Sequence, residues 1–485
     1  MVTPGSNEAH GYEALKGMLT AENLKHFLGK YKNYHSHWPM IHMPSFNPIS
    51  ANDGLVLTMV CIGAVYSDRL GVKEVRWLME LVRASVLRSS RAYKHVTQNS
   101  HEVVDINNRV SADIEEIQAL VHLHSLFVWH GSQKQRQQGR DEFWALAAIA
   151  RRFDLLNPLP NGHPNFSTLH QPGPLDGNEI NTWTWTSWVG QEKRARVMYL
   201  IFLIDASLVM FFNVQPQFDV YDIKIPLPVD DAAWDAKSQE LCASALGLRG
   251  EAAQSENFSG SRRAKQLGMS EALHFLHHGR DFPQRATNIY SKFILIHAIH
   301  VQIFNIQRQA LGLNGLPGYG AFPSSGTSTP RSQSERTSTD GTISNGTSGR
   351  VTPTEGINSQ YSQTHQMLRL TVGALELWKK TWDSDMLIQY PNQRRIGFCR
   401  DGIHFYFLAS IFIRSSRREE WAAPADVRCQ QVFNLLKQIR AHVASDSAQK
   451  GLDIGSVTTI NDSYGVADLT LDMKLLFTPI NDSNR

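Results

Sequence analysis

One run of eighteen residues limits the folds open to this chain more than any other feature. From Val197 to Val214 the sequence reads VMYLIFLIDASLVMFFNV, which is apolar at almost every position. Such a run needs an apolar environment, either lipid or the core of a large protein. Asp205 and Ser207 lie near its centre, where a carboxylate in hydrocarbon would be costly. We therefore predict a central buried helix of a soluble protein that does not enter a membrane.

Helical periodicity extends through most of the chain. A helix is expected from Thr20, which can cap it, to just before Trp38 and Pro39, because a residue preceding proline avoids the α region. Alternating β-branched runs bounded by hairpin turns are scarce, and 157–182 has the Pro, Gly and Asn content of a long loop. The sequence thus predicts an all-α fold, a large irregular helical bundle, with further helices at about 54–67, 72–95, 113–130, 140–155, 187–212, 268–279, 284–311, 360–381, 398–415 and 426–445.

A change of composition divides the chain. Of the 47 residues in 314–360, 32 are Gly, Pro, Ser, Thr or Asn, too polar a mixture to offset the entropy of ordering. We therefore predict a disordered insert within one helical body. The expected organisation is a flexible tail at 1–18, a helical domain at 19–313, the insert at 314–360, C-terminal helices on the same body at 361–447, and a tail at 448–485.

Composition argues against several functional classes. The 48 Lys and Arg residues nearly balance the 45 Asp and Glu residues, so no polyanion-binding surface covers the whole chain. The four cysteines form no C-x-x-C pair, which does not fit a disulfide-stapled secreted domain or a cysteine zinc site. No P-loop, G-x-S-x-G or G-x-G-x-x-G fingerprint occurs. We expect no catalytic residue, no metal and no cofactor in this chain.

Two patterns in the sequence are also compatible with metal binding. Asp230, Asp231 and Asp235 resemble the aspartate-rich run with which class I terpene cyclases, also all-α enzymes, hold magnesium ions on a diphosphate. The run follows Pro228, and a second metal-binding motif is not evident, so a magnesium-dependent enzyme is the alternative to the main interpretation. The other pattern is histidine, in two groups that either ligate a metal or simply pack: His35, His37 and His42, and His274, His277 and His278.

Three stretches occur in a characteristic order. The first is an aromatic helix followed by a proline-stiffened turn, in which Trp38, Ile41 and Phe46 are expected to enter the core. The second is the Gln-Ala-Leu helix at 116–123, followed by 147–155. The third is a Trp…Glu-x-Arg-x-Arg…Asp helix that closes with Pro-x-Pro…Trp. Their signature residues are Trp38, Pro39, His42, Pro44, Phe46, Trp188, Glu192, Arg194, Arg196, Asp205, Pro228 and Trp234.

In order and spacing these stretches resemble the fungal-specific transcription factor domain, the helical middle homology region of fungal zinc-finger regulators. The resemblance is clear over about residues 20–250 and looser to about 445. It implies a nuclear regulator of RNA polymerase II transcription of metabolic genes. It also implies coactivator or corepressor partners, homo- or heterodimers and a small-molecule inducer.

Members of that family carry a DNA-binding zinc module upstream, and no residue of this chain matches one. Zinc and direct DNA contact are therefore expected only in a missing upstream module, and otherwise DNA is reached through a partner. A DNA-free corepressor or decoy is a further alternative.

Within the third stretch, spacing suggests specific contacts. Glu192 and Arg196 are one helical turn apart and can pair, while Arg194 faces elsewhere. Asp205, inside the apolar run, needs a buried donor, either one of these arginines or a backbone amide.

Near the C-terminus, 468–477 interleaves acidic and bulky apolar residues, as in activation segments that fold into a coactivator groove. A final helix packed on the body fits the periodicity equally well. The residues concerned are Leu469, Leu471, Leu475, Leu476 and Phe477.

Overall fold

The computed structural model describes residues 15–35, 38–98, 110–173, 182–248, 265–283, 286–311, 354–388, 401–414 and 423–449. Over these ranges every extended regular element is helical, and the only β pairing is an isolated antiparallel bridge between Pro226 and Gly268. The predicted all-α fold is confirmed. The predicted activation segment and most of the predicted insert lie outside the described residues.

The helices in chain order are α2 (Ala21–His35), α3 (Asp53–Val65), α4 (Val72–Ser89), α5 (Arg91–Thr97), α6 (Val110–His130), α7 (Gln133–Asp141), α8 (Phe143–Arg152), α10 (Trp185–Phe212), α11 (Asp231–Trp234), α12 (Gln239–Leu246), α14 (Met269–His277), α15 (Ile289–Ala310), α16 (Thr354–Ile388), α17 (Ile403–Arg414) and α19 (Ala425–Gln449). Short 3₁₀ turns lie at Met43–Ser45 and Thr168–His170.

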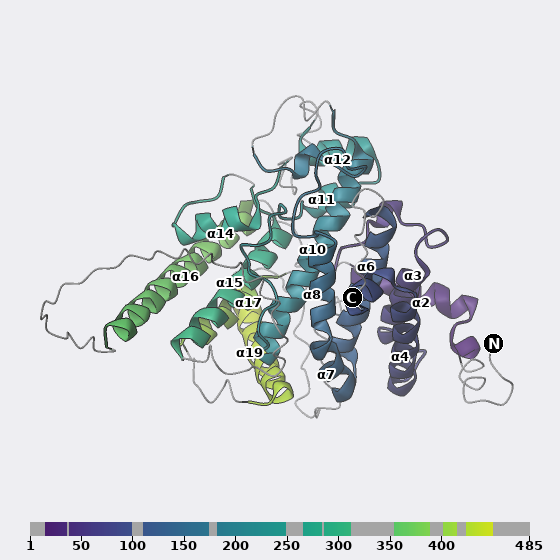
Figure 1. The fold of residues 1–485 in the computed structure, drawn as a ribbon, viewed down its shortest axis with the longest axis horizontal. Coiled ribbons are helices and arrows are strands. Elements are labelled where there is room, and N and C mark those ends of the chain that lie inside the picture. Colours follow the sequence, from purple (N-terminus) through teal and green to yellow (C-terminus); the bar gives the residue numbers. More distant parts are fainter. Residues whose placement is uncertain are drawn as a thin grey trace, which may run out of the picture.

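Helix α10 is the centre of the molecule. It packs against α6, α8, α15 and α19, and it runs through the middle of the body in Figure 1. By length and composition, α10 and α15 are the two helices of the described chain that could cross a membrane. Their apolar windows are 100% and 83% buried inside the protein, as expected of core helices.

The helices before α10 form one side of the body, where α3 packs against α2, α4 and α6 (Figure 1). Local sequence sets their ends: the Asn52 side chain accepts a hydrogen bond from the amide of Leu55 and so caps α3. A Cβ atom at Gly63 would lie 1.9 Å from the carbonyl oxygen of Phe27. Only glycine therefore allows α2 to pack this closely on α3.

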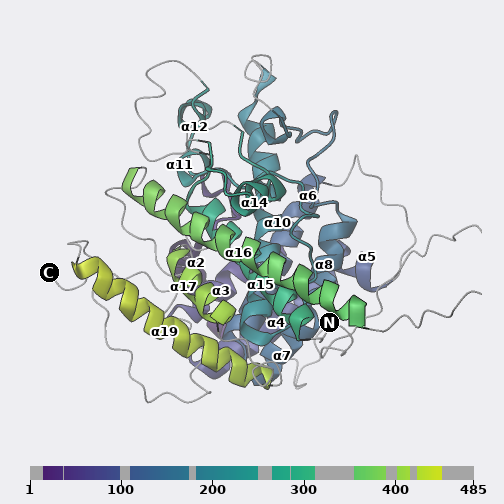
Figure 2. The same cartoon turned by 90° about the vertical axis from the view of Figure 1, so that its left-hand side faces the viewer.

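The helices after α14 cover the other side, where α16 and α19 are the long outer helices of Figure 2. Two buried contacts hold α16 on α15. The Trp378 indole donates to the backbone carbonyl of Lys292 at 3.0 Å, and the Lys292 ammonium lies 3.0 Å from a carboxylate oxygen of Asp385.

Three predicted boundaries were wrong. The expected helix at 72–95 is interrupted at Ser90, whose extended backbone ends α4 and whose side chain caps α5. The expected helix at 140–155 corresponds to α8, which spans only Phe143–Arg152, and the separate helix α7 that ends just before Glu142 was not predicted. Helix α16 begins at Thr354, so the last residues assigned to the disordered insert are helical.

Candidate functional site

The signature residues of α10 form a buried ion pair. Glu192 and Arg196 are both at most 1% exposed, and Arg196 Nε donates to Glu192 Oε1 at 2.8 Å. The pairing predicted from their spacing is confirmed. Because both charges are out of water, each needs further partners to compensate for lost hydration.

Arg196 finds those partners on two distant loops. Its Nη1 donates to the carbonyl of Pro39 at 3.1 Å, and its Nη2 donates to the carbonyl of Val229 at 2.8 Å. The guanidinium also lies 4.4 Å from the ring centre of Trp234 and 3.9 Å from a carboxylate oxygen of Asp231. One side chain therefore joins α10 to the turn after α2 and to the segment before α11. We call this contact the arginine junction.

Glu192 completes the arginine junction. Its carboxylate accepts from the amide of Val229 at 3.1 Å and from His170 Nε2 at 3.0 Å. Burial alone would raise the pKa of Glu192, but the hydrogen bond from His170 and the charge of Arg196 bring it below the usual value. Glu192 is thus ionised. His170 lies in the predicted loop at 157–182, and no pattern in the sequence pointed to it.

His42 closes the junction on the side of the first signature. Its ring is fully buried, 4.8 Å from the ring centre of Trp234 in an edge-on arrangement, and Nδ1 lies 2.7 Å from the hydroxyl of Ser45. Burial, assisted by the charges of Lys193 and Arg196, lowers the pKa of His42 to about 4. The imidazole is therefore neutral under ordinary conditions.

The proline-stiffened turn enters the core only in part. Trp38 and Ile41 are buried, as expected, and the side chain of Pro39 is also covered. Phe46 is only half-buried, packed at the margin of the core, and Pro44 is exposed. Phe46, which follows the 3₁₀ turn Met43–Ser45, therefore meets the expectation of a core position only in part.

The remaining α10 signature residues make structural contacts. Arg194 faces away from the junction, as predicted, and donates to the carbonyls of Phe153 and Asp154. Asp205 accepts from the backbone amides of Gln217 and Phe218, so its donors are amides and not the arginines. Burial raises the pKa of Asp205 to about 7 despite these hydrogen bonds. Trp188 is fully buried, and the Pro228 carbonyl accepts from Asn288.

The aspartate run has a structural explanation. The Asp230 side chain accepts from the amide of Ala233 and caps α11, while Asp231 lies beside Arg196. Among the described residues, no group of three His, Cys, Asp or Glu side chains could hold a metal ion. Two of the three carboxylates proposed for a diphosphate-bound magnesium site, those of Asp230 and Asp231, thus contribute to a helix end and to the junction.

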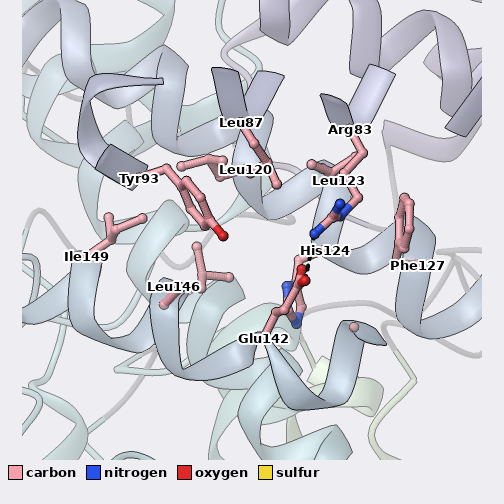
Figure 3. Close-up of a pocket in the computed structure, with 12 residues that line it drawn as sticks. Arg83, Leu87, Tyr93, Leu120, Leu123, His124, Phe127, Glu142, Leu146 and Ile149 are labelled. Carbon is pink, nitrogen blue, oxygen red and sulfur yellow. Dashed lines mark hydrogen bonds and ion pairs between the residues drawn. The ribbon is translucent and has the colours of Figure 1, made fainter. Parts of the chain in front are cut away.

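A cavity of about 40 Å³ lies apart from the junction, between α4, α5, α6, α7 and α8. Figure 3 shows Arg83 and Glu142 paired beside it, with N–O separation 2.6 Å, and the hydroxyl of Tyr93 directed into the space. Burial lowers the pKa of His124 to about 4 and raises that of Tyr93. The rest of the wall is apolar: Leu87, Leu120, Leu123, Phe127, Leu146 and Ile149. Sequence reasoning missed this site because its polar residues come from segments with no common motif.

Comparison with known proteins identifies the helical body. The family described as "Fungal specific transcription factor domain" matches residues 30–312, which is more than half of the chain. The chain belongs to this family. The matched range contains every residue of the arginine junction and of the cavity.

Individual relatives carry consistent names. The chain is 22% identical over 228 residues to "Zinc finger protein zas1" of Schizosaccharomyces pombe, covering 47% of this chain and 23% of that protein. It is 23% identical over 239 residues to "Transcription factor verF" of Penicillium polonicum, covering 49% of this chain and 31% of that protein. "Zinc finger protein klf1" of S. pombe is 22% identical, and the match covers 48% of this chain and 27% of that protein. This chain therefore spans less than a third of these relatives' length, and no solved structure matches it.

Proposed function

We propose that this chain is the regulatory part of a transcription regulator that controls RNA polymerase II transcription of metabolic genes in the nucleus. The family match over residues 30–312 carries the proposal, and the relatives' names as transcription factors support it. The arginine junction adds a physical reason. A buried pair that joins three segments of the body couples their positions, so a partner or ligand that moves one segment would also move the others.

DNA binding would come from elsewhere. Two relatives are named zinc finger proteins, and the part of this chain that the structure describes holds no cluster of three metal ligands. We place the zinc and the base contacts in a separate module, or in a partner protein that brings this chain to promoters. Coactivators or corepressors would then bind the helical body, and dimers with itself or a relative belong to the same proposal.

The cavity is our candidate for the inducer site. Its charge is already balanced, because Arg83 is paired with Glu142, so a ligand there would be neutral. The Tyr93 hydroxyl and the His124 imidazole offer hydrogen bonds, and the apolar wall accepts a short hydrocarbon part. About 40 Å³ holds roughly three water molecules or a ligand of similar size. Binding would act by changing how α4 packs on α7 and α8.

The test of regulation is a tethered reporter assay. The chain is fused to an unrelated DNA-binding module and expressed beside a reporter gene that carries the matching site. We expect output to change severalfold against the module alone, upward for an activator or downward for a corepressor. Output equal to that of the module alone, with the fusion present in the nucleus, would contradict the proposal.

The inducer site has its own variants in the same assay. Leu146→Phe fills the cavity and should abolish the response to metabolites while basal output remains. Val72→Phe is the matched control, since Val72 lies on α4 with 55% of its surface exposed and away from the cavity lining. An unchanged response in Leu146→Phe would show that the inducer binds elsewhere.

A further inference from the structure

Helix α14 carries three histidines near its C-terminal end, and the structure separates their roles. His277 is half-buried, and its Nε2 lies 3.0 Å from the Oε1 atom of Gln302 on α15. His274 and His278 are exposed, with ring centres 3.9 Å apart and planes inclined by 32°. His277 thus packs on the body, while His274 and His278 share a solvent-facing surface.

The tautomer of His278 is fixed by its environment. Its Nδ1 lies 2.9 Å from the backbone carbonyl oxygen of His274. A carbonyl oxygen only accepts, so Nδ1 carries a proton, and in the neutral imidazole Nε2 is then the nitrogen with the free lone pair. A histidine that donates one ring nitrogen to a backbone carbonyl and presents the other to solvent is already in the form that binds metal ions.

The surroundings favour a cation. His274 and His278 are four residues apart, the spacing with which one helix face offers two imidazoles to zinc. They lie at the C-terminal end of α14, where the carbonyl groups give the helix its partial negative charge. Glu271, one turn before His274 and exposed, adds a carboxylate on the same face. Further along the chain come Arg280 and Asp281, and Asp281 pairs with Lys380 of α16.

We propose that His274 and His278 form an exchangeable site for a divalent transition-metal ion, with water completing the coordination. Two imidazoles suit Zn²⁺, Cu²⁺ and Ni²⁺, whereas Mg²⁺ and Ca²⁺ prefer oxygen ligands. Both side chains are exposed, so an ion reaches them from solvent without any opening of the fold. The bound ion would brace the last turn of α14, which packs on α15 and α16. This site is separate from zinc in a DNA-binding module.

Calorimetric titration of the metal-free chain with ZnCl₂ and CuCl₂ tests the proposal, with MgCl₂ as the oxygen-preferring comparison. We expect saturable Zn²⁺ and Cu²⁺ binding that becomes at least tenfold weaker in His274→Gln and in His278→Gln. His277→Gln is the matched control on the same helix and should bind as the wild type does. Wild-type isotherms in the double variant His274→Gln/His278→Gln, or an equal loss in His277→Gln, would overturn the proposal.

A measurement on the unsubstituted protein keeps the test independent of the variants' folding. Diethyl pyrocarbonate modifies exposed imidazoles, and a bound ion occupies the reacting nitrogen. Zn²⁺ should slow modification of His274 and His278 at least fivefold while leaving the exposed His365 unaffected. Equal slowing at all three histidines, or none, would contradict a specific site.

Discussion

At the scale of single residues, Arg196 connects more of the fold than any other side chain of the junction. Its guanidinium contacts Glu192 on α10, the carbonyls of Pro39 and Val229 on separate loops, and the ring of Trp234. Spacing within α10 predicted only the first of these contacts. The two carbonyl contacts join positions 157 and 33 residues away, and backbone carbonyls leave no mark in a sequence.

Replacing Arg196 by Met should therefore be strongly destabilising. The substitution keeps the apolar stem but leaves the Glu192 carboxylate buried with His170 as its remaining side-chain partner. Removing one partner of a buried pair costs about 3–5 kcal/mol. Urea unfolding followed by circular dichroism measures the change, and the double variant Arg196→Met/Glu192→Leu should recover part of the loss. A cost below about 1 kcal/mol for the single variant would show that the junction contributes little.

His42 gives the junction a pH dependence. Its pKa is about 4 in the folded protein against an ordinary value of 6.5, so the unfolded chain binds the proton more readily between these values. Stability contributed by His42 is then complete above pH 6.5 and falls as pH drops toward 4. The difference in unfolding free energy between wild type and His42→Gln should change by up to about 1.4 kcal/mol per pH unit in that window. A difference independent of pH would contradict a neutral, buried His42.

At the scale of elements, periodicity located the long helices but neither the short helices α7, α11 and α12 nor the break between α4 and α5. The interruption at Ser90 depends on a cap in which its hydroxyl accepts from the amide of Tyr93, and Ser90 also bonds to Glu116 on α6. Helix α16 runs from Thr354 to Ile388, beyond its expected range of 360–381, and Trp382 in the added C-terminal part is buried on the body. Tertiary contacts of this kind override local composition.

The contact between α16 and α15 predicts unequal effects of two substitutions. Lys292 is 1% exposed, and burial lowers its pKa to about 8 although Asp385 opposes the shift. Asp385→Asn leaves the buried ammonium without its carboxylate, whereas Lys292→Met leaves only a carboxylate that is 22% exposed. Thermal unfolding should show a larger loss for Asp385→Asn than for Lys292→Met. A larger loss for Lys292→Met than for Asp385→Asn would mean that groups other than Asp385 stabilise the buried ammonium of Lys292.

The segment 466–485 lies outside the described residues and stays a prediction from sequence. If its acidic and apolar residues form an activation segment, deleting 466–485 should abolish reporter activation by the tethered chain. The shortened chain should keep its unfolding midpoint, which separates this outcome from loss of the fold. Unchanged activation would remove the hypothesis and favour a simple tail.

At the scale of the whole molecule, the fold class and the family follow from sequence because both depend on patterns that are local. Apolar periodicity predicted the helices, and the buried run at Val197–Val214 predicted the central helix α10. The cavity could not be predicted, since Arg83, His124 and Glu142 meet only when five helices pack. For the same reason the aspartates at 230 and 231 suggested a metal site until the structure showed a helix cap and an arginine contact.

The central claim is that this chain belongs to a regulator that acts at promoters. Chromatin immunoprecipitation of the tagged protein at its native locus, combined with transcript measurements in a strain lacking it, tests this claim most directly. We expect enrichment at a defined set of promoters whose transcripts change when the protein is absent. Enrichment no higher than in an untagged strain, with the protein present in the nucleus, would contradict the account.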